Sequence, residues 1–344
     1  MRTLSLRELN RATLARQLLL DRRRVPVMRT VEQVAGLQAQ RAFGPYVGLW
    51  SRIEGFRREA LQRALVRGDV LKATVMRGTL HLVSARDYPV FRAALPRPLS
   101  WADAGITTVG ERIAAEVRGL FQNGPLPASV PLEHIVRVHG YEDEVARNRV
   151  WHTARVAGHI LHAPESAFFS APPRNAFHAI AEPERVELAV ARAELVRRYL
   201  AAFGPASRAD LADWSGLRVG ELAPALDALE PLRRFRDESG RELLDLPRAP
   251  LPPADAPAPI RFLPMWDSVL LGHKDRTRVL PEEYRKTVIA KNGDVAQTFL
   301  VDGFVAGTWW IEKGSVVTEP FGQLSRAARG ELEEEAARLE AWLR

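Results

Sequence analysis

The chain has 344 residues and lacks cysteine altogether. Without thiols there is no disulfide framework, no thiolate zinc finger and no cysteine nucleophile, which fits a reducing cytoplasm. Lysine is scarce, with five of the 49 basic residues, and such an arginine bias is typical of a GC-rich genome. No apolar run approaches the roughly 20 residues that span a bilayer, and the N-terminus lacks the apolar core of a signal peptide. We therefore expect a cytoplasmic protein that does not enter a membrane.

Positive charge gathers in the first part of the chain. Residues 1–100 carry 19 Lys and Arg against 7 Asp and Glu, a net charge of +12, whereas the rest of the chain has a net charge of −5. A basic region on a mildly acidic body is typical of a surface that faces a polyanion such as DNA. A high arginine content alone says little about phosphate recognition. The inference of a DNA-facing surface therefore depends on the uneven distribution of charge along the chain.

The basic region has the element order of a winged helix. Apolar spacing predicts an amphipathic helix over 4–22. A second helix is expected to open at Thr30 with a capping box, and a third covers 57–67. Residues 70–83 then indicate two strands around a tight turn at Arg77-Gly78. Three helices followed by a β-hairpin is the winged-helix order, a relative of the helix-turn-helix.

The same order recurs twice further along. Apolar spacing predicts the helices 110–122, 132–139, 145–157, 184–203, 207–214 and 219–229, and the short strands 159–162, 167–170, 232–235 and 243–246. Next come a Pro- and Ala-rich linker and a β-prone segment with hairpin turns at Asn292-Gly293 and Asp302-Gly303. We predict an α+β, mostly α fold with the divisions 1–105 (winged helix 1), 106–182 (winged helix 2), 183–246 (winged helix 3), 247–259 (linker) and 260–344 (small β domain with a terminal helix).

Two glutamines in the first unit are the candidate catalytic residues. Gln38 and Gln40 stand in Gly36-Leu37-Gln38-Ala39-Gln40-Arg41, shortly before Gly44-Pro45, which is able to end a helix. In mid-helix they would point about 200° apart, but in extended or helix-terminal backbone residues i and i+2 share a side. Two neutral amides orient a water without taking its proton strongly. That suffices only for a good leaving group, such as a cationic N7-alkylated guanine. The alternative is an ordinary pair of polar helix-end residues.

Other residues are candidates for contact with DNA. On the first hairpin, Arg77, Thr79 and His81 could reach phosphate or lesion, unless the hairpin is merely a solvated turn. Arg41 adjoins the glutamines. Lys274 and Arg276 lie in a basic loop of the kind that grips a DNA backbone, although Asp275 could instead pair with an arginine in an ordinary surface turn.

Two other chemistries are weaker interpretations. The second unit contains histidines 134, 139, 152, 159 and 162, but zinc takes about four ligands and cysteine does not help, so we expect core, wing or phosphate contacts and no metal. Lys72 is the only lysine in the basic region, and a Schiff-base lyase would need such an amine. An exposed strand lysine is the commoner explanation.

At this point the sequence resembles the winged-helix DNA glycosylases similar to AlkZ and YcaQ. The resemblance is carried by Gly36-Leu37-Gln38-Ala39-Gln40, by Met76-Arg77-Gly78-Thr79-Leu80-His81-Leu82, and by residues 9–17, 262–264, 270–276, 301–303 and 307–309. It implies three tandem winged helices in a concave arrangement that cradles DNA, with a C-terminal β domain. One branch of the family has aspartate at the second glutamine position, and this chain has Gln40, as in the AlkZ branch.

The resemblance also implies a function. It predicts a monofunctional DNA glycosylase that removes bulky N7-alkylguanines by water attack at the anomeric carbon, with Gln38 and Gln40 in the catalytic signature. In some members the activity includes the unhooking of interstrand crosslinks. Double-stranded DNA is then the partner, the protein is nucleoid-associated and monomeric, and no cofactor is needed. A non-enzymatic winged-helix protein, such as a regulator or lesion sensor, is the alternative, because most winged helices are regulators.

Overall fold

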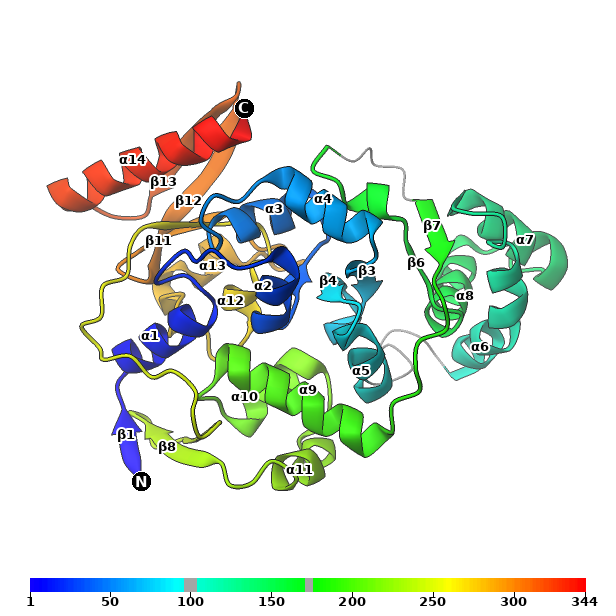
Figure 1. Cartoon of the computed structure of the whole chain (residues 1–344), viewed down its shortest axis with the longest axis horizontal. Coiled ribbons are helices and arrows are strands. Elements are labelled where there is room, and N and C mark those ends of the chain that lie inside the picture. Colours follow the sequence, from blue (N-terminus) through cyan, green and yellow to red (C-terminus); the bar gives the residue numbers. More distant parts are fainter. Residues whose placement is uncertain (96–103, 171–175) are drawn as a thin grey trace.

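A computed structural model, which describes residues 1–95, 104–170 and 176–344, has an α+β fold in which helices predominate (Figure 1). This fold class was predicted from the sequence. The α-helices are α1 Leu6–Arg16, α2 Val27–Gln33, α3 Phe43–Trp50, α4 Arg58–Val66, α5 Asp87–Ala94, α6 Ala104–Gly119, α7 Ser129–His139, α8 Glu144–Ala157, α9 Leu188–Phe203, α10 Arg208–Ser215, α11 Val219–Asp227, α12 Ser268–Leu271, α13 Arg285–Val288 and α14 Arg326–Leu343. Short 3-10 turns occur at η1 Met76–Gly78, η2 Pro164–Ala167 and η3 Glu282–Tyr284.

The described strands form three sheets. The largest has the order β2-β4-β3-β6-β7-β5, with the bounds β2 Leu37–Gln38, β3 Val70–Thr74, β4 Leu80–Ser84, β5 Leu126–Pro127, β6 Ile160–His162 and β7 Ala176–Ala179. It joins the first predicted unit to the second, because Lys72 of β3 pairs with His162 of β6. The helices α6, α7 and α8 build a separate core beside it, at the right of Figure 1.

The third group of helices, α9 to α11, precedes the hairpin of β8 Arg233–Asp237 and β9 Glu242–Asp245. The N-terminal strand β1, Arg2–Leu4, completes this sheet by pairing in parallel with β8. The first residues of the chain therefore share a sheet with residues 233–245. Ser5 then caps α1 and forms a capping box with Glu8, which explains why the helix begins at residue 6 and not at residue 4.

The C-terminal region contains the sheet β10-β11-β12-β13, with the bounds β10 Arg261–Leu263, β11 Thr298–Val301, β12 Phe304–Glu312 and β13 Ser315–Pro320. The predicted turn at Asp302-Gly303 joins β11 to β12. Phe262, Phe299 and Trp309 of this sheet share a hydrophobic core with α2, α3 and α4, so the C-terminal region packs on the first helices. No helix of the described residues is both long and apolar enough to cross a bilayer.

Several local expectations were wrong. The strand predicted over 167–170 is absent, because η2 ends at Ala167 and residues 168–170 form a turn. Thr30 does not open α2, because this helix begins at Val27 and the Thr30 hydroxyl donates to the Pro26 carbonyl from within it. The helix that Gly44-Pro45 was expected to end stops earlier, at Gln33, and Gly44-Pro45 lies in the first turn of α3. A Thr-x-x-Gln pattern is typical of a capping box, but the same pattern also occurs inside a helix that has begun earlier. The positive φ angles of Ala35 and Gly36 end the helical conformation after α2.

Candidate active site around Gln38

A tight turn connects α2 to the short strand β2. Ala35 and Gly36 both have positive φ, at 57° and 93°, and the Gly36 N–H donates to the Val31 carbonyl at 2.9 Å. A Cβ on Gly36 would lie 3.3 Å from the Leu82 carbonyl oxygen. Position 36 therefore favours glycine for both its conformation and its close packing. The turn fixes where the next two residues enter the sheet.

Gln38 lies opposite His81 in the antiparallel pair of β2 and β4. The Ala39 N–H continues the ladder by donating to the Leu80 carbonyl at 2.7 Å. Gln38 is 9% exposed, whereas Gln40 is an exposed residue just beyond the strand. In extended backbone, side chains two residues apart project from the same side. The pair thus consists of one amide fixed in the sheet and one at the surface.

Arg77 at the tip of the first hairpin contacts Gln38. Its Nη2 lies 3.5 Å from the Gln38 Oε1, and its Nη1 donates to the Trp214 carbonyl of α10 at 2.9 Å. Arg77 has a φ of 54°, a conformation that non-glycine residues seldom adopt. Burial lowers the pKa of its guanidinium, and Asp213 opposes that effect. Arg77 therefore ties the hairpin tip to α10 and orients the amide oxygen of Gln38.

His81 supports the site as a neutral side chain. It is 2% exposed, and its Nδ1 lies 3.1 Å from the Thr79 carbonyl oxygen. Burial, and then the charge of Arg77, lower the pKa of His81 to about 3. Because its imidazole is neutral at physiological pH, His81 does not form an ion pair with a phosphate. Thr79 is itself half-buried, and its hydroxyl donates to the Met76 carbonyl within the turn.

Asp213 is a site residue that sequence reasoning missed. This exposed carboxylate of α10 acts electrostatically on both Arg77 and Arg276, and it opposes the lowering of their pKa values by burial. Three segments far apart in the sequence therefore meet here: the first hairpin, α10 and the loop 273–278. The sequence signal was only one acidic residue in a short helix, and nothing in its spacing points to a hairpin 136 positions earlier.

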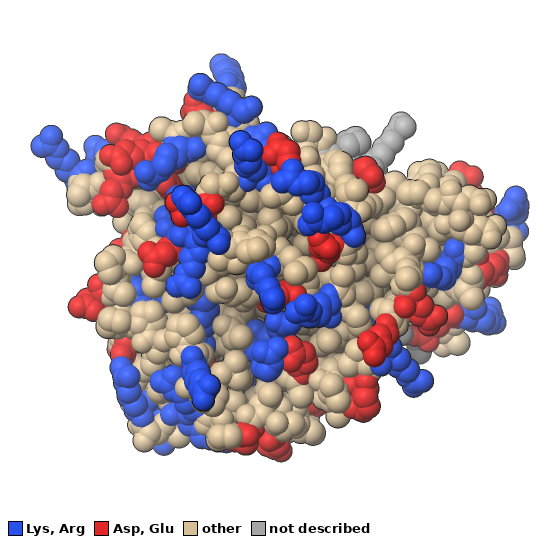
Figure 2. Space-filling model, in the orientation of Figure 1, with Lys and Arg blue, Asp and Glu red and all other residues tan. Residues whose placement is uncertain are grey.

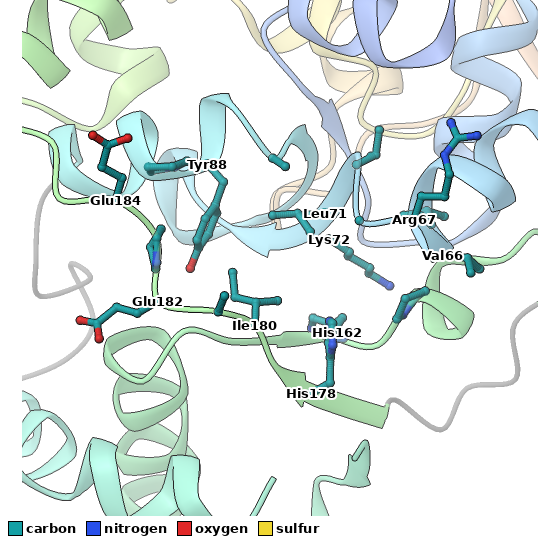
Figure 3. Close-up of a pocket in the computed structure, with 18 residues that line it drawn as sticks. Val66, Arg67, Leu71, Lys72, Tyr88, His162, His178, Ile180, Glu182 and Glu184 are labelled. Atoms are coloured by element: carbon teal, nitrogen blue, oxygen red, sulfur yellow. The ribbon is translucent and has the colours of Figure 1, made fainter. Parts of the chain in front are cut away.

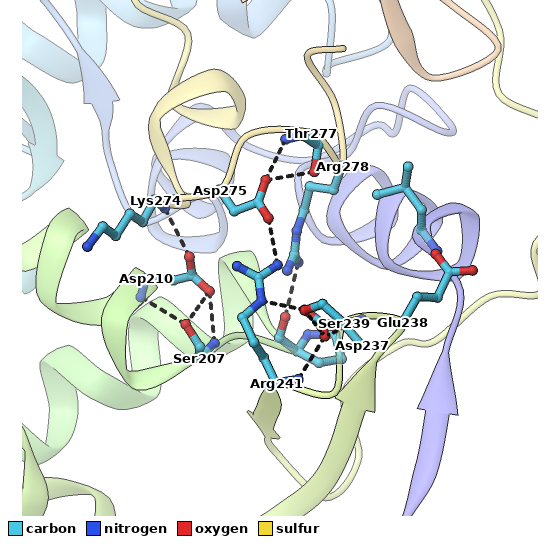
Figure 4. A network of polar contacts seen from close by, with 12 residues as sticks. Ser207, Asp210, Asp237, Glu238, Ser239, Arg241, Lys274, Asp275, Thr277 and Arg278 are labelled. Atoms are coloured by element: carbon cyan, nitrogen blue, oxygen red, sulfur yellow. Dashed lines mark hydrogen bonds and ion pairs between the residues drawn. The ribbon is translucent and has the colours of Figure 1, made fainter. Parts of the chain in front are cut away.

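The loop 273–278 is tied to neighbouring elements by hydrogen bonds, as Figure 4 shows. The Lys274 N–H donates to Asp210 at 2.9 Å, and Asp275 accepts from Arg241 at 2.6 Å and from the Thr277 hydroxyl at 2.7 Å. Burial alone would raise the pKa of the Asp275 carboxyl, but these hydrogen bonds hold it at about 2. The pairing of Asp275 with an arginine, one of the two sequence interpretations, is thus present, and the Lys274 side chain is exposed.

Lys72 lies on the other face of the same sheet. His81 pairs with both Gln38 and Ala73 across the strands, so these three side chains lie on one face of the sheet. Lys72 precedes Ala73, and because side chains alternate along a strand, it lies on the other face. Lys72 lines a cavity of about 470 Å³ (Figure 3), and its amine donates a hydrogen bond to the Ser166 carbonyl at 3.1 Å. Burial lowers the pKa of this amine to about 8. Its position on the opposite face does not support a lyase that uses Lys72 at the glutamine site.

Basic side chains are visible over α2 to α4 and in the region between these helices and α9 and α10 (Figure 2). Arg41 is exposed next to the glutamines, and Arg276 is half-buried. Part of the positive charge predicted for the surface is nevertheless neutralised by ion pairs within the molecule, some of them buried. The N-terminal arginines that pair with acidic residues of the C-terminal half are Arg7 and Arg11 (both with Asp302), Arg16 (Asp245), Arg22 (Glu335) and Arg52 (Asp267).

Comparison with known proteins identifies the family of the chain. A family model described as DNA glycosylase AlkZ-like matches residues 31–342. The chain is 24% identical over 358 residues to an interstrand DNA cross-link repair glycosylase of Streptomyces sahachiroi, covering 94% of this chain and 92% of that protein. The solved structure of the DNA glycosylase AlkZ of Streptomyces sahachiroi has the same fold, with a TM-score of 0.82 at 22% identity over 99% of this chain and 97% of that one. With its family model matched over most of the sequence, the chain belongs to the AlkZ-like DNA glycosylase family.

Proposed function

We propose that the protein is a monofunctional DNA glycosylase that excises bulky N7-alkylated guanines, including those that form interstrand crosslinks. The observation that carries this proposal is the pair of neutral amides, with Gln38 fixed between Arg77 and His81 and Gln40 exposed beside it. The crosslink-repair activity named for the relative from Streptomyces sahachiroi supports the substrate class.

The chemistry that these amides support is hydrolysis of an already activated bond. Water oxygen bonds to the anomeric carbon, and the bond from that carbon to guanine N9 breaks. The electron pair of the broken bond neutralises the cationic imidazolium ring of the departing base, and the water proton passes to solvent. One lone pair of the Gln38 oxygen faces Arg77, which leaves its other lone pair and its amide hydrogens for the water. Oriented amide dipoles also stabilise positive charge that grows on the sugar.

DNA binding is assigned to exposed cations around the pair. Arg41 and Lys274 are exposed and Arg276 is half-buried, so these three residues are available to phosphates. We further propose that residues 1–105, 106–182 and 183–246 are three winged-helix units that cradle the duplex, with 247–259 as a linker and 260–344 as a β domain. Helices followed by an antiparallel pair of strands in each division support this assignment.

The test is single-turnover excision from duplexes that carry N7-methylguanine, a bulky N7 adduct or a neutral lesion. Gln38→Ala and Gln40→Ala are each expected to slow release of the cationic bases by about 10- to 1000-fold, the range for loss of one positioned polar group. DNA affinity should stay near the wild-type value because phosphates supply most of it. Neutral lesions should be poor substrates even for the wild-type protein.

Gln122→Ala is the matched control, because Gln122 is an exposed glutamine far along the chain from the pair. If both site variants keep the wild-type rate, the glutamines are structural and the reaction occurs elsewhere. If the wild-type protein binds each duplex but releases no base, the non-enzymatic reading as a regulator or lesion sensor replaces the glycosylase.

A further inference from the structure

A cluster of metal-binding side chains lies in the second predicted unit, away from the glutamine pair. Glu116 of α6 meets His134 and His139 of α7. The His134 Nε2 lies 2.5 Å, and the His139 Nε2 3.2 Å, from the same Glu116 oxygen. One ligand atom from each residue falls within 4.8 Å of the other two. We propose that Glu116, His134 and His139 bind one zinc ion.

The set of side chains suits zinc. Two imidazole nitrogens and one carboxylate oxygen form a known zinc ligand set, and the fourth position is open to water. Bond lengths of about 2.0–2.1 Å place tetrahedral ligand atoms about 3.4 Å apart, so small side-chain shifts would accommodate an ion among these three. Imidazole ligands favour zinc over magnesium or calcium, which prefer oxygen.

The surroundings also suit a cation. One oxygen of the Glu116 carboxyl lies within hydrogen-bonding distance of both histidine rings, so the three side chains already converge on one point. His139 is the last residue of α7, which ends at Gly140 in the left-handed conformation. The C-terminal end of a helix carries partial negative charge that favours a nearby cation. Both histidine side chains are also only 15–17% exposed, so their rings are already positioned.

A bound ion would reinforce the direct contact between α6 and α7 that Glu116 already makes with the two histidines. Both α6 and α7 contact α8, and they share a core with it that includes Val117 and Ile135. Zinc at Glu116, His134 and His139 would replace these hydrogen bonds between α6 and α7 with bonds to the metal. We therefore expect the ion to stabilise the body formed by α6, α7 and α8, far from the reaction at Gln38.

The test uses the full-length protein after treatment with a chelator, titrated with zinc chloride by calorimetry at neutral pH. One ion should bind per chain, and the melting temperature should rise with the logarithm of zinc concentration. Cobalt substitution should give the absorption bands of a tetrahedral ion. Glu116→Gln keeps the size and hydrogen-bonding oxygen of residue 116 but removes the charged ligand. We expect this variant, His134→Gln and His139→Gln to weaken zinc binding by at least about 10-fold.

Matched controls separate this site from adventitious binding. Glu111→Gln changes an exposed glutamate of the same helix, and His178→Gln changes a half-buried histidine outside the cluster; both should bind zinc as the wild type does. His134→Cys supplies a thiolate ligand and should restore much of the affinity lost in His134→Gln. The proposal is overturned if the wild-type protein binds no zinc, or if the three ligand variants titrate like the two controls. In that case the cluster is a hydrogen-bonded contact only.

Discussion

The glutamine pair shows how neighbours give two identical side chains different properties. Gln38 is buried in a strand and contacts Arg77, whereas Gln40 follows the strand end and is exposed. A fixed amide and a surface amide have different freedom to reorient, so we assign orientation of the water to Gln38 and contact with the sugar region to Gln40. This division extends the proposed mechanism and rests on it.

Arg77 and Lys274 are expected to respond differently to loss of charge. Lys274→Ala should weaken DNA binding and flatten its salt dependence, by about 0.9 log unit per log unit of salt if one phosphate contact is lost. Arg77→Ala should slow excision but leave the salt dependence unchanged, because its guanidinium is bound to the Trp214 carbonyl and to Gln38. Binding measured over a salt series checks both. Equal flattening in the two variants would show that Arg77 contacts phosphate instead.

At the scale of elements, short segments are held by partners from distant parts of the chain. The strand β1 needs β8, and the loop 273–278 needs Asp210 and Arg241. The helix α1 is fixed in the same way by Arg16, whose two Nη atoms bind the two oxygens of Asp245 at 2.7 and 2.9 Å. Both side chains are almost fully buried, at 1% and 0% exposed.

Breaking this buried pair should destabilise the protein strongly. Asp245→Asn leaves the Arg16 charge buried without its counter-charge, and removal of one partner from a buried pair costs about 3–5 kcal/mol. The exposed pair of Arg67 and Asp69 is the control, and Asp69→Asn should cost about 0–1 kcal/mol. Urea unfolding measures both free energies. A loss below 1 kcal/mol in Asp245→Asn would mean that the site rearranges or hydrates.

For the whole molecule, folding redistributes the charge that the sequence concentrates in residues 1–100. Arg16 and Arg52 of this region are buried counter-ions, and Arg77 near the glutamines is close enough to Arg276 of the loop 273–278 for the two charges to interact. The surface that we propose for DNA binding therefore combines Arg41 with Lys274 and Arg276, which come from opposite halves of the chain. The net charge of a sequence segment such as residues 1–100 therefore overestimates the positive charge that is exposed to a phosphate.

Stability of the whole chain should fall as the solution becomes acidic. Burial lowers the pKa of His81, His152 and His273 to about 3, and that of His162 to about 2. An unfolded histidine titrates near 6.5, so the unfolded state binds more protons below that pH. The neutral histidines make their full contribution to the free energy of unfolding above about pH 6.5, and this contribution is lost progressively toward pH 3.

Each such histidine contributes a slope of up to about 1.4 kcal/mol per pH unit in that window. Urea unfolding at a series of pH values should therefore show the free energy of unfolding falling steeply below pH 6. His162→Gln should reduce the slope by about one proton, because only one buried histidine is removed. A free energy that stays constant from pH 7 to pH 5 would contradict the burial of these rings.

The sequence by itself determined the elements that depend on neighbouring residues. Apolar periodicity located most of the helices, and the turns at Arg77-Gly78 and Asp302-Gly303 were placed correctly because their conformational demands are local. The α+β class and the family resemblance followed from such patterns and were confirmed. The roles of the glutamine pair stay a prediction.

Tertiary structure decided what depends on residues far apart in the chain. It brought Asp213 to Arg77, paired β1 with β8 and placed Lys72 and Gln38 on opposite faces of one sheet. It also brought His134 and His139, two of the six histidines in residues 106–182, to Glu116. Spacing along one helix or strand fixes which side chains share its face, but the partner that covers this face is set by packing of the whole chain.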